Sequence, residues 1–110
     1  RFAVAELVRE QVLSLTREEV PHAVAVVVEE MEEREAKNLV YIRANIFVEK
    51  ETQKRILIGK NGAMLKTIGE RARASIEALL GVRVFLDLWV KVKADWRDTE
   101  SVLRELGYRT

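Results

Sequence analysis

The 110-residue sequence has no cysteine, one histidine, one proline and five glycines. Without cysteine there is no disulfide framework and no thiolate chemistry. The lone His22 has no second histidine or cysteine with which to share a metal ion, so we expect it to be structural or exposed. No serine stands in a nucleophile setting, and the acidic clusters lack the alternating ligands of a calcium loop. The sequence therefore predicts neither a catalytic constellation nor a metal site.

The sequence also lacks a long apolar run. The longest, residues 23–28, is far below the roughly 20 residues that span a bilayer. No charged leader with an apolar segment and a small-residue cleavage site opens the chain, so we expect no secretory signal. The first residue is Arg1 rather than methionine, and we expect the chain to be a piece of a longer protein. These features and the absence of cysteine favour a cytoplasmic location.

The charge is unevenly distributed along a chain whose net charge is only +1. With 48% hydrophobic and 34% charged residues, the composition predicts one folded domain. Residues 1–35 carry four basic and nine acidic side chains, whereas residues 50–73 carry seven basic and two acidic ones. A local basic patch on a nearly neutral protein indicates a focused site for a polyanion. The alternative is a solvated helix face.

Hydrophobic periodicity predicts six main elements, a short element between the second strand and the helix over 63–80, and a three-stranded α+β fold with helices on one side of the sheet. The expected elements are a helix over 2–15, strands over 22–31 and 40–48, a helix over 63–80, a strand over 82–93 and a helix over 96–106. Pro21 opens the first strand, a charged turn over 32–38 follows it, and Gly81 caps the helix at 63–80. Trp96 is expected to anchor the final helix.

Alternation predicts which face of each strand is buried. In residues 40–48 one face is apolar, and we expect the other to be largely exposed to water; that second face carries Tyr41, Arg43, Asn45 and Phe47. In the strand over 82–93, Phe85 and Trp89 lie opposite the apolar face. We favour packing of these two rings against the core or a helix. The alternative is that they stack on RNA bases.

Two glycines three residues apart, Gly59 and Gly62, flank Lys60 and Asn61. Glycine loses more backbone freedom on folding than other residues, so the pair needs a reason. A phosphate loop of the nucleoside triphosphatase kind requires glycine where Leu65 stands, and the dinucleotide fingerprint requires a third glycine. Two interpretations remain: a plain glycine-rich turn, and a GXXG loop that lets a nucleic-acid backbone lie against the protein.

The segment Ile58-Gly59-Lys60-Asn61-Gly62, followed by Lys66 and Ile68, resembles the Ile-Gly-x-x-Gly-x-x-Ile-Lys-x-Ile signature of KH domains. Leu65 stands where isoleucine is usual. Two strands before the motif and one after it resemble the type II form of this fold. The blocks Leu86 to Lys93 and Leu103 to Tyr108 resemble the C-terminal end of the Era family of bacterial ribosome-assembly GTPases.

The resemblance implies that residues 1–110 form a single type II KH domain with an additional C-terminal helix, lacking the GTPase domain that precedes it in that family. It implies no enzyme activity and no cofactor for this chain, while GTP and magnesium belong to the absent domain. The implied partners are single-stranded RNA at the 3′ end of small-subunit ribosomal RNA during ribosome assembly, the small subunit, and the chain's own GTPase domain. The alternative is a docking module for proteins or for the membrane surface, with a membrane-peripheral location.

The resemblance also implies the site. We expect the glycine loop to clamp the backbone of about four nucleotides. Lysine and arginine side chains would contact phosphates, while Ile56, Ile58 and the end of the second strand would form an apolar floor for bases. The expected RNA-binding residues are Lys54, Arg55, Ile56, Ile58, Gly59, Lys60, Asn61, Gly62 and Lys66.

Two local features stay open in the sequence. In the type II fold, residues 56–58 would belong to a short helix, but the apolar triplet is equally compatible with a strand. The turn over residues 49–52 lacks the glycine that the resemblance leads us to expect there, so the sequence does not establish its geometry.

Overall fold

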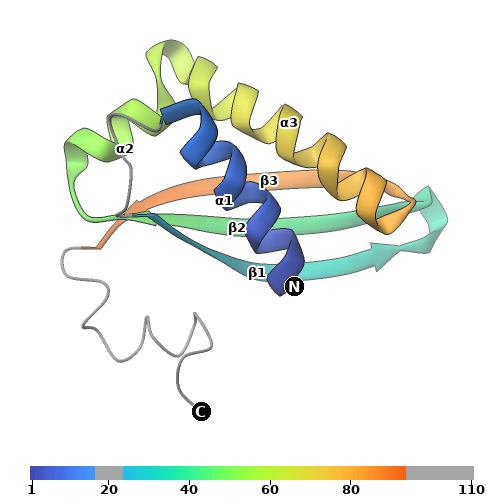
Figure 1. Cartoon of the computed structure of the whole chain (residues 1–110). Coiled ribbons are helices and arrows are strands. Elements are labelled where there is room, and N and C mark those ends of the chain that lie inside the picture. Colours follow the sequence, from blue (N-terminus) through green and yellow to red (C-terminus); the bar gives the residue numbers. More distant parts are fainter. Residues whose placement is uncertain (17–23, 94–110) are drawn as a thin grey trace.

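The computed structural model describes residues 1–16 and 24–93, in which three helices cover one side of a three-stranded sheet (Figure 1). The elements are α1 (Phe2–Thr16), β1 (Val24–Arg34), η1 (Glu35–Lys37), β2 (Leu39–Val48), α2 (Glu51–Ile58), η2 (Lys60–Gly62), α3 (Ala63–Leu80) and β3 (Arg83–Val92). This arrangement confirms the predicted α+β, type II KH architecture. His22, Trp96 and the helix predicted over 96–106 lie outside the described residues.

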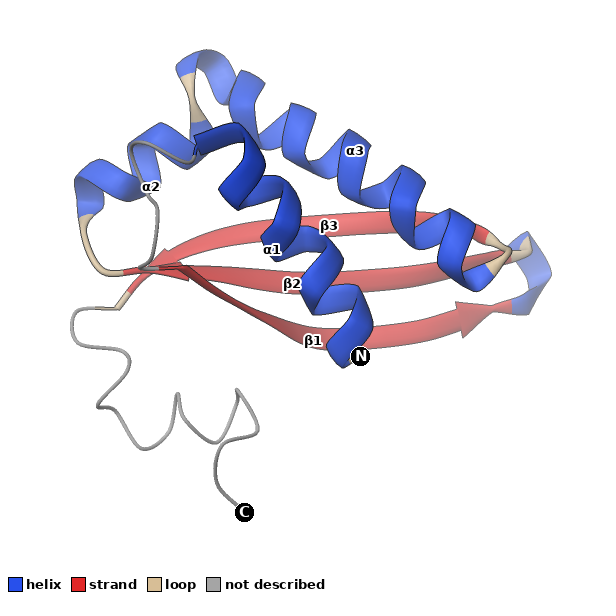
Figure 2. Cartoon of the chain, viewed as in Figure 1, coloured by secondary structure: helices blue, strands red, loops and turns tan. Residues whose placement is uncertain are grey.

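The sheet is mixed, with strand order β1-β2-β3 (Figure 2). Strands β1 and β2 are antiparallel, whereas β2 and β3 are parallel. Parallel neighbours require a crossover connection, which α2, η2 and α3 provide. The crossover places α3 over the sheet next to β3, so that β3 is an edge strand with a helix above it.

The charged turn predicted over residues 32–38 is shorter in the structure. β1 continues through Arg34, which pairs with Leu39, and the reversal itself comprises only η1 and Asn38. Asn38 adopts a left-handed conformation (φ 50°), which asparagine tolerates better than most residues. The end of β1 stays paired with β2 through its backbone, while its charged side chains are exposed to water. Hydrophobic periodicity does not detect a strand segment whose side chains are mostly charged.

The helices and one face of the sheet form the main core. Apolar side chains from α1, β2, α2 and α3 meet there, in the alternation and helical spacing that the sequence predicts. The members with no measurable exposure are Val8, Val12, Ile42, Ala44, Ile46, Val48, Leu57, Ile68, Ala72 and Ile76. The C-terminal end of α3 is linked to the start of β3, because the Val84 backbone N–H donates a 2.8 Å hydrogen bond to the Glu77 carboxylate.

The opposite face of β2 is not largely exposed as predicted. Phe47 and Asn45 are only 2% and 3% exposed. Phe47 packs with Ala25 and Val27 of β1 in a second small cluster. The Asn45 side-chain amide donates a 2.9 Å hydrogen bond to the carboxylate of Glu29, where β1 bulges. The prediction was wrong because the apolar run of β1 is buried on both faces, a situation that alternation in β2 does not reveal.

Residues 56–58 belong to α2, which decides between the helix and the strand left open by the sequence. The preceding turn needs no glycine because a side chain stabilises it. The amide oxygen of Gln53 accepts hydrogen bonds from the backbone N–H groups of Glu49 (3.0 Å) and Lys50 (2.9 Å). Such a cap satisfies backbone donors that a helix N-terminus otherwise leaves without a partner.

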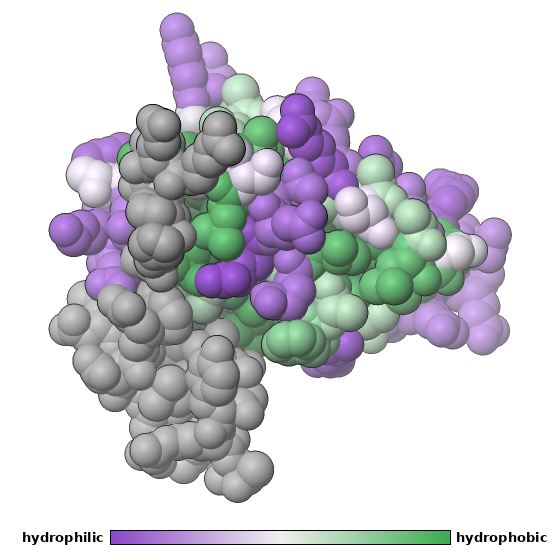
Figure 3. Space-filling view, in the orientation of Figure 1, coloured by the Kyte–Doolittle hydropathy of each residue, from purple (hydrophilic) through white to green (hydrophobic). Residues whose placement is uncertain are grey.

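Hydrophilic side chains project at the top of the molecule, where the η2 loop lies (Figure 3). Lys60 and Asn61 in this loop are both exposed. Within residues 1–16 and 24–93, every helix is too short or too polar to cross a membrane.

Candidate nucleic-acid interface

The Gly59–Gly62 loop joins α2 to α3 through a sharp change of direction. Gly59 has φ 75° and ψ 178°, Asn61 has φ 56°, and Gly62 has φ 78° and ψ 9°. The Gly62 backbone N–H donates to the Gly59 carbonyl oxygen at 3.2 Å, which closes the loop. Three of the four residues therefore have a positive φ, a backbone conformation that is unfavourable for residues with a Cβ atom.

The two glycines are needed for different reasons. A Cβ atom at Gly59 would lie 2.7 Å from the Cβ atom and 2.8 Å from the backbone nitrogen of Met64, so the loop packs directly against the first turn of α3. A Cβ atom at Gly62 would meet nothing within 4 Å. The backbone angle alone therefore requires glycine at position 62, and a ligand can approach the surface of this residue.

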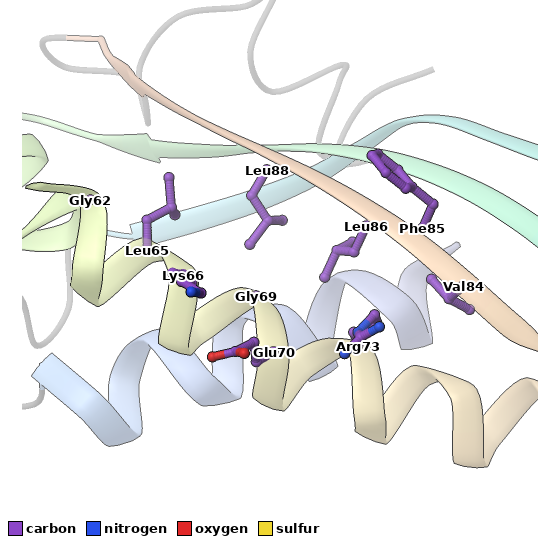
Figure 4. Close-up of a pocket in the computed structure, with 10 residues that line it drawn as sticks. All are labelled: Gly62, Leu65, Lys66, Gly69, Glu70, Arg73, Val84, Phe85, Leu86 and Leu88. Carbon is purple, nitrogen blue, oxygen red and sulfur yellow. The ribbon is translucent and has the colours of Figure 1, made fainter.

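The loop opens onto a groove of about 410 Å³ between α3 and β3 (Figure 4). Its lining combines charged side chains of α3 with apolar side chains from both elements. The lining residues are Gly62, Leu65, Lys66, Gly69, Glu70, Arg73, Val84, Phe85, Leu86 and Leu88. Such a groove offers cations for phosphates and an apolar surface for bases, while the N-terminus of α3 favours an anion.

Gly69 has a role that its place inside a helix does not reveal. It lies where α3 faces β3, and an added Cβ atom would stand 3.7 Å from Cδ1 of Leu88. This distance is ordinary van der Waals contact, so alanine fits here without a clash. Glycine at this position leaves the space above Leu88 to the groove, although glycine weakens a helix relative to alanine.

The structure divides the predicted RNA-binding residues into three groups. Gly62 and Lys66 line the groove, and Gly59, Lys60 and Asn61 form the loop at its end. Lys54, Arg55, Ile56 and Ile58 lie on α2 and are not among the residues that line the groove. RNA contact by each of these residues stays a prediction.

The apolar floor expected for bases, formed by Ile56, Ile58 and the end of β2, stays a prediction. Ile56 and Ile58 are partly buried and pack against the main core, and β2 is the central strand of the sheet. The apolar lining of the groove includes Leu86 and Leu88 of β3 and Leu65 of α3. The leucines of β3 reach the groove because β3 pairs in parallel with β2, which puts β3 at the edge beneath α3.

Sequence reasoning missed several groove residues, above all Glu70 and Arg73 of α3 and the leucines of β3. A signal for Arg73 was present: Lys66, Gly69 and Arg73 stand at spacings of three and four, which place them on one face of a helix. The contribution of β3 has no such local signal, because it depends on which strand lies below α3.

Phe85 and Trp89 are 55% and 50% exposed, so the favoured interpretation that they pack into the core or against a helix is wrong. Both lie on the face of β3 away from the main core. The ring of Phe85 stacks on Tyr41 with a centroid distance of 5.8 Å, and the Arg43 guanidinium lies 5.4 Å from the centre of the Trp89 ring. These contacts orient the rings without burying them.

Tyr41 also has a polar partner on β3. Its hydroxyl donates a 3.0 Å hydrogen bond to the Asp87 carboxylate. This bond, assisted by desolvation and by the negative charge of Asp87, raises the pKa of the Tyr41 hydroxyl above its ordinary value of 10.0. In the part of the chain that the structure describes, the aspartate and glutamate side chains form no group of three that could hold a metal ion.

Comparison with known proteins agrees with this architecture. The family model described as KH domain matches residues 19–97. The chain is 61% identical over 108 residues to GTPase Era of Carboxydothermus hydrogenoformans, a match that covers 98% of this chain and 36% of that protein. The chain thus spans about 36% of the length of this relative.

Two solved structures are similar over nearly the whole chain. One is a variant of Era from Aquifex aeolicus bound to GDP and AlF4⁻, with a TM-score of 0.90 at 46% identity, covering 100% of this chain and 37% of that one. The other is Era in complex with MgGDPNP and nucleotides 1506–1542 of 16S ribosomal RNA, with a TM-score of 0.88 at 46% identity, covering 97% of this chain and 36% of that one. The resemblance seen in the sequence is confirmed, and the chain belongs to the KH domain family, in the form that GTPase Era carries.

Proposed function

We propose that the chain binds single-stranded RNA in the groove between α3 and β3, with the Gly59–Gly62 loop against the sugar-phosphate backbone. The observation that carries this proposal is the junction of loop and groove at Gly62, where no neighbouring atom would obstruct a ligand. Lys60 and Lys66 are exposed on the two sides of this junction and would contact phosphates. The leucines of the groove would receive bases, so that phosphates position the strand and base edges specify it.

The partner we propose is the 3′ end of small-subunit ribosomal RNA, bound during assembly of the small ribosomal subunit. The support is the similar Era structure that contains nucleotides 1506–1542 of 16S ribosomal RNA. In this proposal the chain is the RNA-binding, non-catalytic part of a cytoplasmic GTPase. The similar Era structures were solved with GDP and AlF4⁻ or with MgGDPNP, and in this proposal GTP and magnesium bind the part of those proteins that this chain does not match.

The test is a fluorescence-anisotropy titration with a short RNA of the 3′-end sequence and a scrambled RNA. The decisive variant is Lys60→Asp with Asn61→Asp, which reverses the loop charge at exposed positions. The chain offers a matched control: Lys37 and Asn38 form a second exposed Lys-Asn pair, in the turn between β1 and β2, and Asn38 also has a positive φ. We expect the loop variant to lose binding and Lys37→Asp with Asn38→Asp to retain it.

Equal affinity of the loop variant and the unchanged chain at the same salt concentration would contradict the proposal.

One observation favours a second function, a docking module for proteins: the end of β1 carries exposed acidic residues that would repel RNA. Docking would be indicated if binding to ribosomal proteins survives both ribonuclease and the loop-charge reversal. Sedimentation with anionic liposomes tests the membrane-peripheral alternative, for which we expect little binding at physiological salt.

A further inference from the structure

The sheet face away from the helices (Figure 2) carries a polar hollow of about 230 Å³. It lies toward the end of the sheet at which the parallel strands β2 and β3 finish. Its lining consists of Glu29, Arg43, Asn45, Phe47, Lys91 and Lys93. The groove between α3 and β3 shares no lining residue with this hollow. The two are therefore separate places at which a ligand could bind.

Three cations line the hollow without an acidic partner. Arg43, Lys91 and Lys93 form no ion pair with any residue that the structure describes. Aromatic rings orient two of them instead. The Arg43 guanidinium lies 5.4 Å from the centre of the Trp89 ring, and the Lys93 ammonium nitrogen lies 5.5 Å from the centre of the Phe47 ring. The positive charge of the hollow is thus held in place but not neutralised, which favours an anion.

Two buried polar atoms of the lining lack a hydrogen-bond partner. Asn45 is only 3% exposed, and its amide nitrogen donates a 2.9 Å hydrogen bond to the Glu29 carboxylate, which leaves its Oδ1 as an acceptor. Neither this Oδ1 nor Nε of Arg43 has a partner among the described residues. Buried polar atoms are almost always paired, so an unpaired acceptor and an unpaired donor in one hollow point to a ligand that completes both.

The two unpaired atoms restrict the chemistry of that ligand. It must accept a hydrogen bond from Arg43 and donate one to Asn45. Chloride or a fully ionised phosphate can only accept. A ribonucleotide 3′-phosphate carries the 2′-hydroxyl on the neighbouring carbon, so that one ligand brings an anion and a donor together. The deoxyribose counterpart has the anion but lacks this donor.

We propose that the hollow binds a ribose 3′-phosphate unit, whose phosphate contacts Arg43 and Lys91 and whose 2′-hydroxyl donates to Oδ1 of Asn45. The inference goes beyond the proposed function, because the hollow lies away from the glycine loop and does not require the groove. Since the contacts involve sugar and phosphate alone, the hollow distinguishes RNA from DNA without reading bases. A free ribonucleotide and an RNA chain both carry this unit, and the two arms of the test separate them.

The first arm titrates the unchanged chain with adenosine 3′-monophosphate and with its 2′-deoxy counterpart. Amide nitrogen–proton correlation spectra report where each probe binds. We expect the backbone amides of Arg43, Asn45 and Lys91 to shift, while those of Gly59 and Gly62 stay in place. The ribonucleotide should bind about fivefold more tightly than the deoxynucleotide, which is the effect of one neutral hydrogen bond.

Lys91→Gln has a matched control in Arg83→Gln. Both residues are exposed on the same face of β3, but only Lys91 lines the hollow. We expect Lys91→Gln to weaken binding of the ribonucleotide by about tenfold, in the range of a hydrogen bond to a charged group, and Arg83→Gln to leave it unchanged. Arg43→Lys keeps the positive charge but removes the Nε donor, and it should also weaken binding.

The second arm uses a short RNA and the chain with Lys60→Asp and Asn61→Asp, in which the glycine loop is disabled. If an RNA chain supplies the ribose 3′-phosphate unit, this variant retains weak binding of RNA that a further Lys91→Gln substitution removes. We expect this result. If only a free ribonucleotide supplies the unit, the RNA does not shift the amides of the hollow, whereas adenosine 3′-monophosphate does.

The inference is overturned if neither nucleotide nor RNA shifts the amides of the hollow, if the shifts are confined to Gly59 and Gly62, or if the ribonucleotide and the deoxynucleotide bind equally. Equal losses in Lys91→Gln and Arg83→Gln would overturn it as well. Failure of the proposed function looks different, because it would leave the first arm unchanged. Thermal unfolding of each variant separates loss of contact from loss of fold, which we do not expect at the exposed position of Lys91.

Discussion

An added Cβ atom at Gly59 would lie 2.7 Å from the Cβ atom of Met64, whereas at Gly62 it would meet no atom within 4 Å. The backbone angles differ as well. Gly59, with φ 75° and ψ 178°, occupies a region that is essentially reserved for glycine, while Gly62 is in the left-handed helical region that other residues can enter with strain. The two halves of one motif therefore tolerate substitution differently.

We expect Gly59→Ala to destabilise the fold more than Gly62→Ala. The Gly62 substitution should lower the free energy of unfolding by about 1 kcal/mol, the strain of a left-handed alanine. The Gly59 substitution adds a clash with the backbone of α3 and should lower it by about 3 kcal/mol. Urea denaturation followed by circular dichroism measures both values, and equal losses would contradict the packing role of Gly59.

Gln53 is predicted to stabilise the turn before α2. Its side-chain oxygen accepts two backbone hydrogen bonds, from Glu49 and Lys50, so Gln53→Ala should lower the free energy of unfolding by about 1 kcal/mol. Gln53→Glu keeps an acceptor in the same place and serves as the control. If the alanine and glutamate variants unfold at the same urea concentration, the side chain does not support this turn.

The link between α3 and β3 gives a prediction for Glu77. Its carboxylate accepts the Val84 N–H at 2.8 Å, and Val84 is buried, so Glu77→Ala would leave this donor without its partner. We expect a loss of about 1–3 kcal/mol in the free energy of unfolding. Glu77→Gln retains an acceptor oxygen and should lose less. Thermal unfolding in which Glu77→Ala matches the unchanged chain would refute the prediction.

Tyr41 and Asp87 should make stability depend on pH in the alkaline range. The pKa of Tyr41 is raised above 10.0 by its hydrogen bond to Asp87, so the folded chain holds this proton more tightly than the unfolded chain does. The stabilisation is therefore fully present below pH 10 and is lost as the pH rises through the folded pKa. Asp87→Asn should reduce this loss and lower the pKa of Tyr41.

The measurement is a spectrophotometric titration of tyrosine ionisation in a Tyr108→Phe background, because the chain has two tyrosines. Thermal unfolding from about pH 9 to about pH 11, on either side of the ordinary tyrosine pKa, then compares that background with and without the Asp87→Asn substitution. Other groups titrate in the same range, so only the difference between the two chains reports on this pair. An unchanged pKa of Tyr41 in Asp87→Asn would show that the hydrogen bond does not control the hydroxyl.

Local patterns in the sequence were sufficient for much of the fold. The helical spacing from Ala63 to Leu80 and the glycine that caps it both appear as predicted, since they depend on interactions within one element. The extension of β1 to Arg34 and the burial of Phe47 were missed because they depend on pairing with another strand. Periodicity describes one element at a time and carries no information about its neighbours.

The candidate site divides in the same way. The glycine loop is a short, contiguous motif, and its unusual backbone could be inferred from Gly59 and Gly62 alone. The apolar lining could not, because Leu86 and Leu88 reach the groove only through the parallel pairing of β3 with β2. Exposure of Phe85 likewise follows from its place on an edge strand, which no stretch of sequence around it specifies.

The edge position of β3 has a consequence for self-association. Within the described sheet, β3 pairs on one side only, so its other side can present backbone groups to a strand of a second molecule. Arg83 and Lys91, both exposed, would bring like charges together if two copies met there. This protection is electrostatic and weakens as salt screens the charges. The edge that keeps the groove open to a ligand is thus also an edge at which the chain becomes more prone to pair with a second copy at high ionic strength.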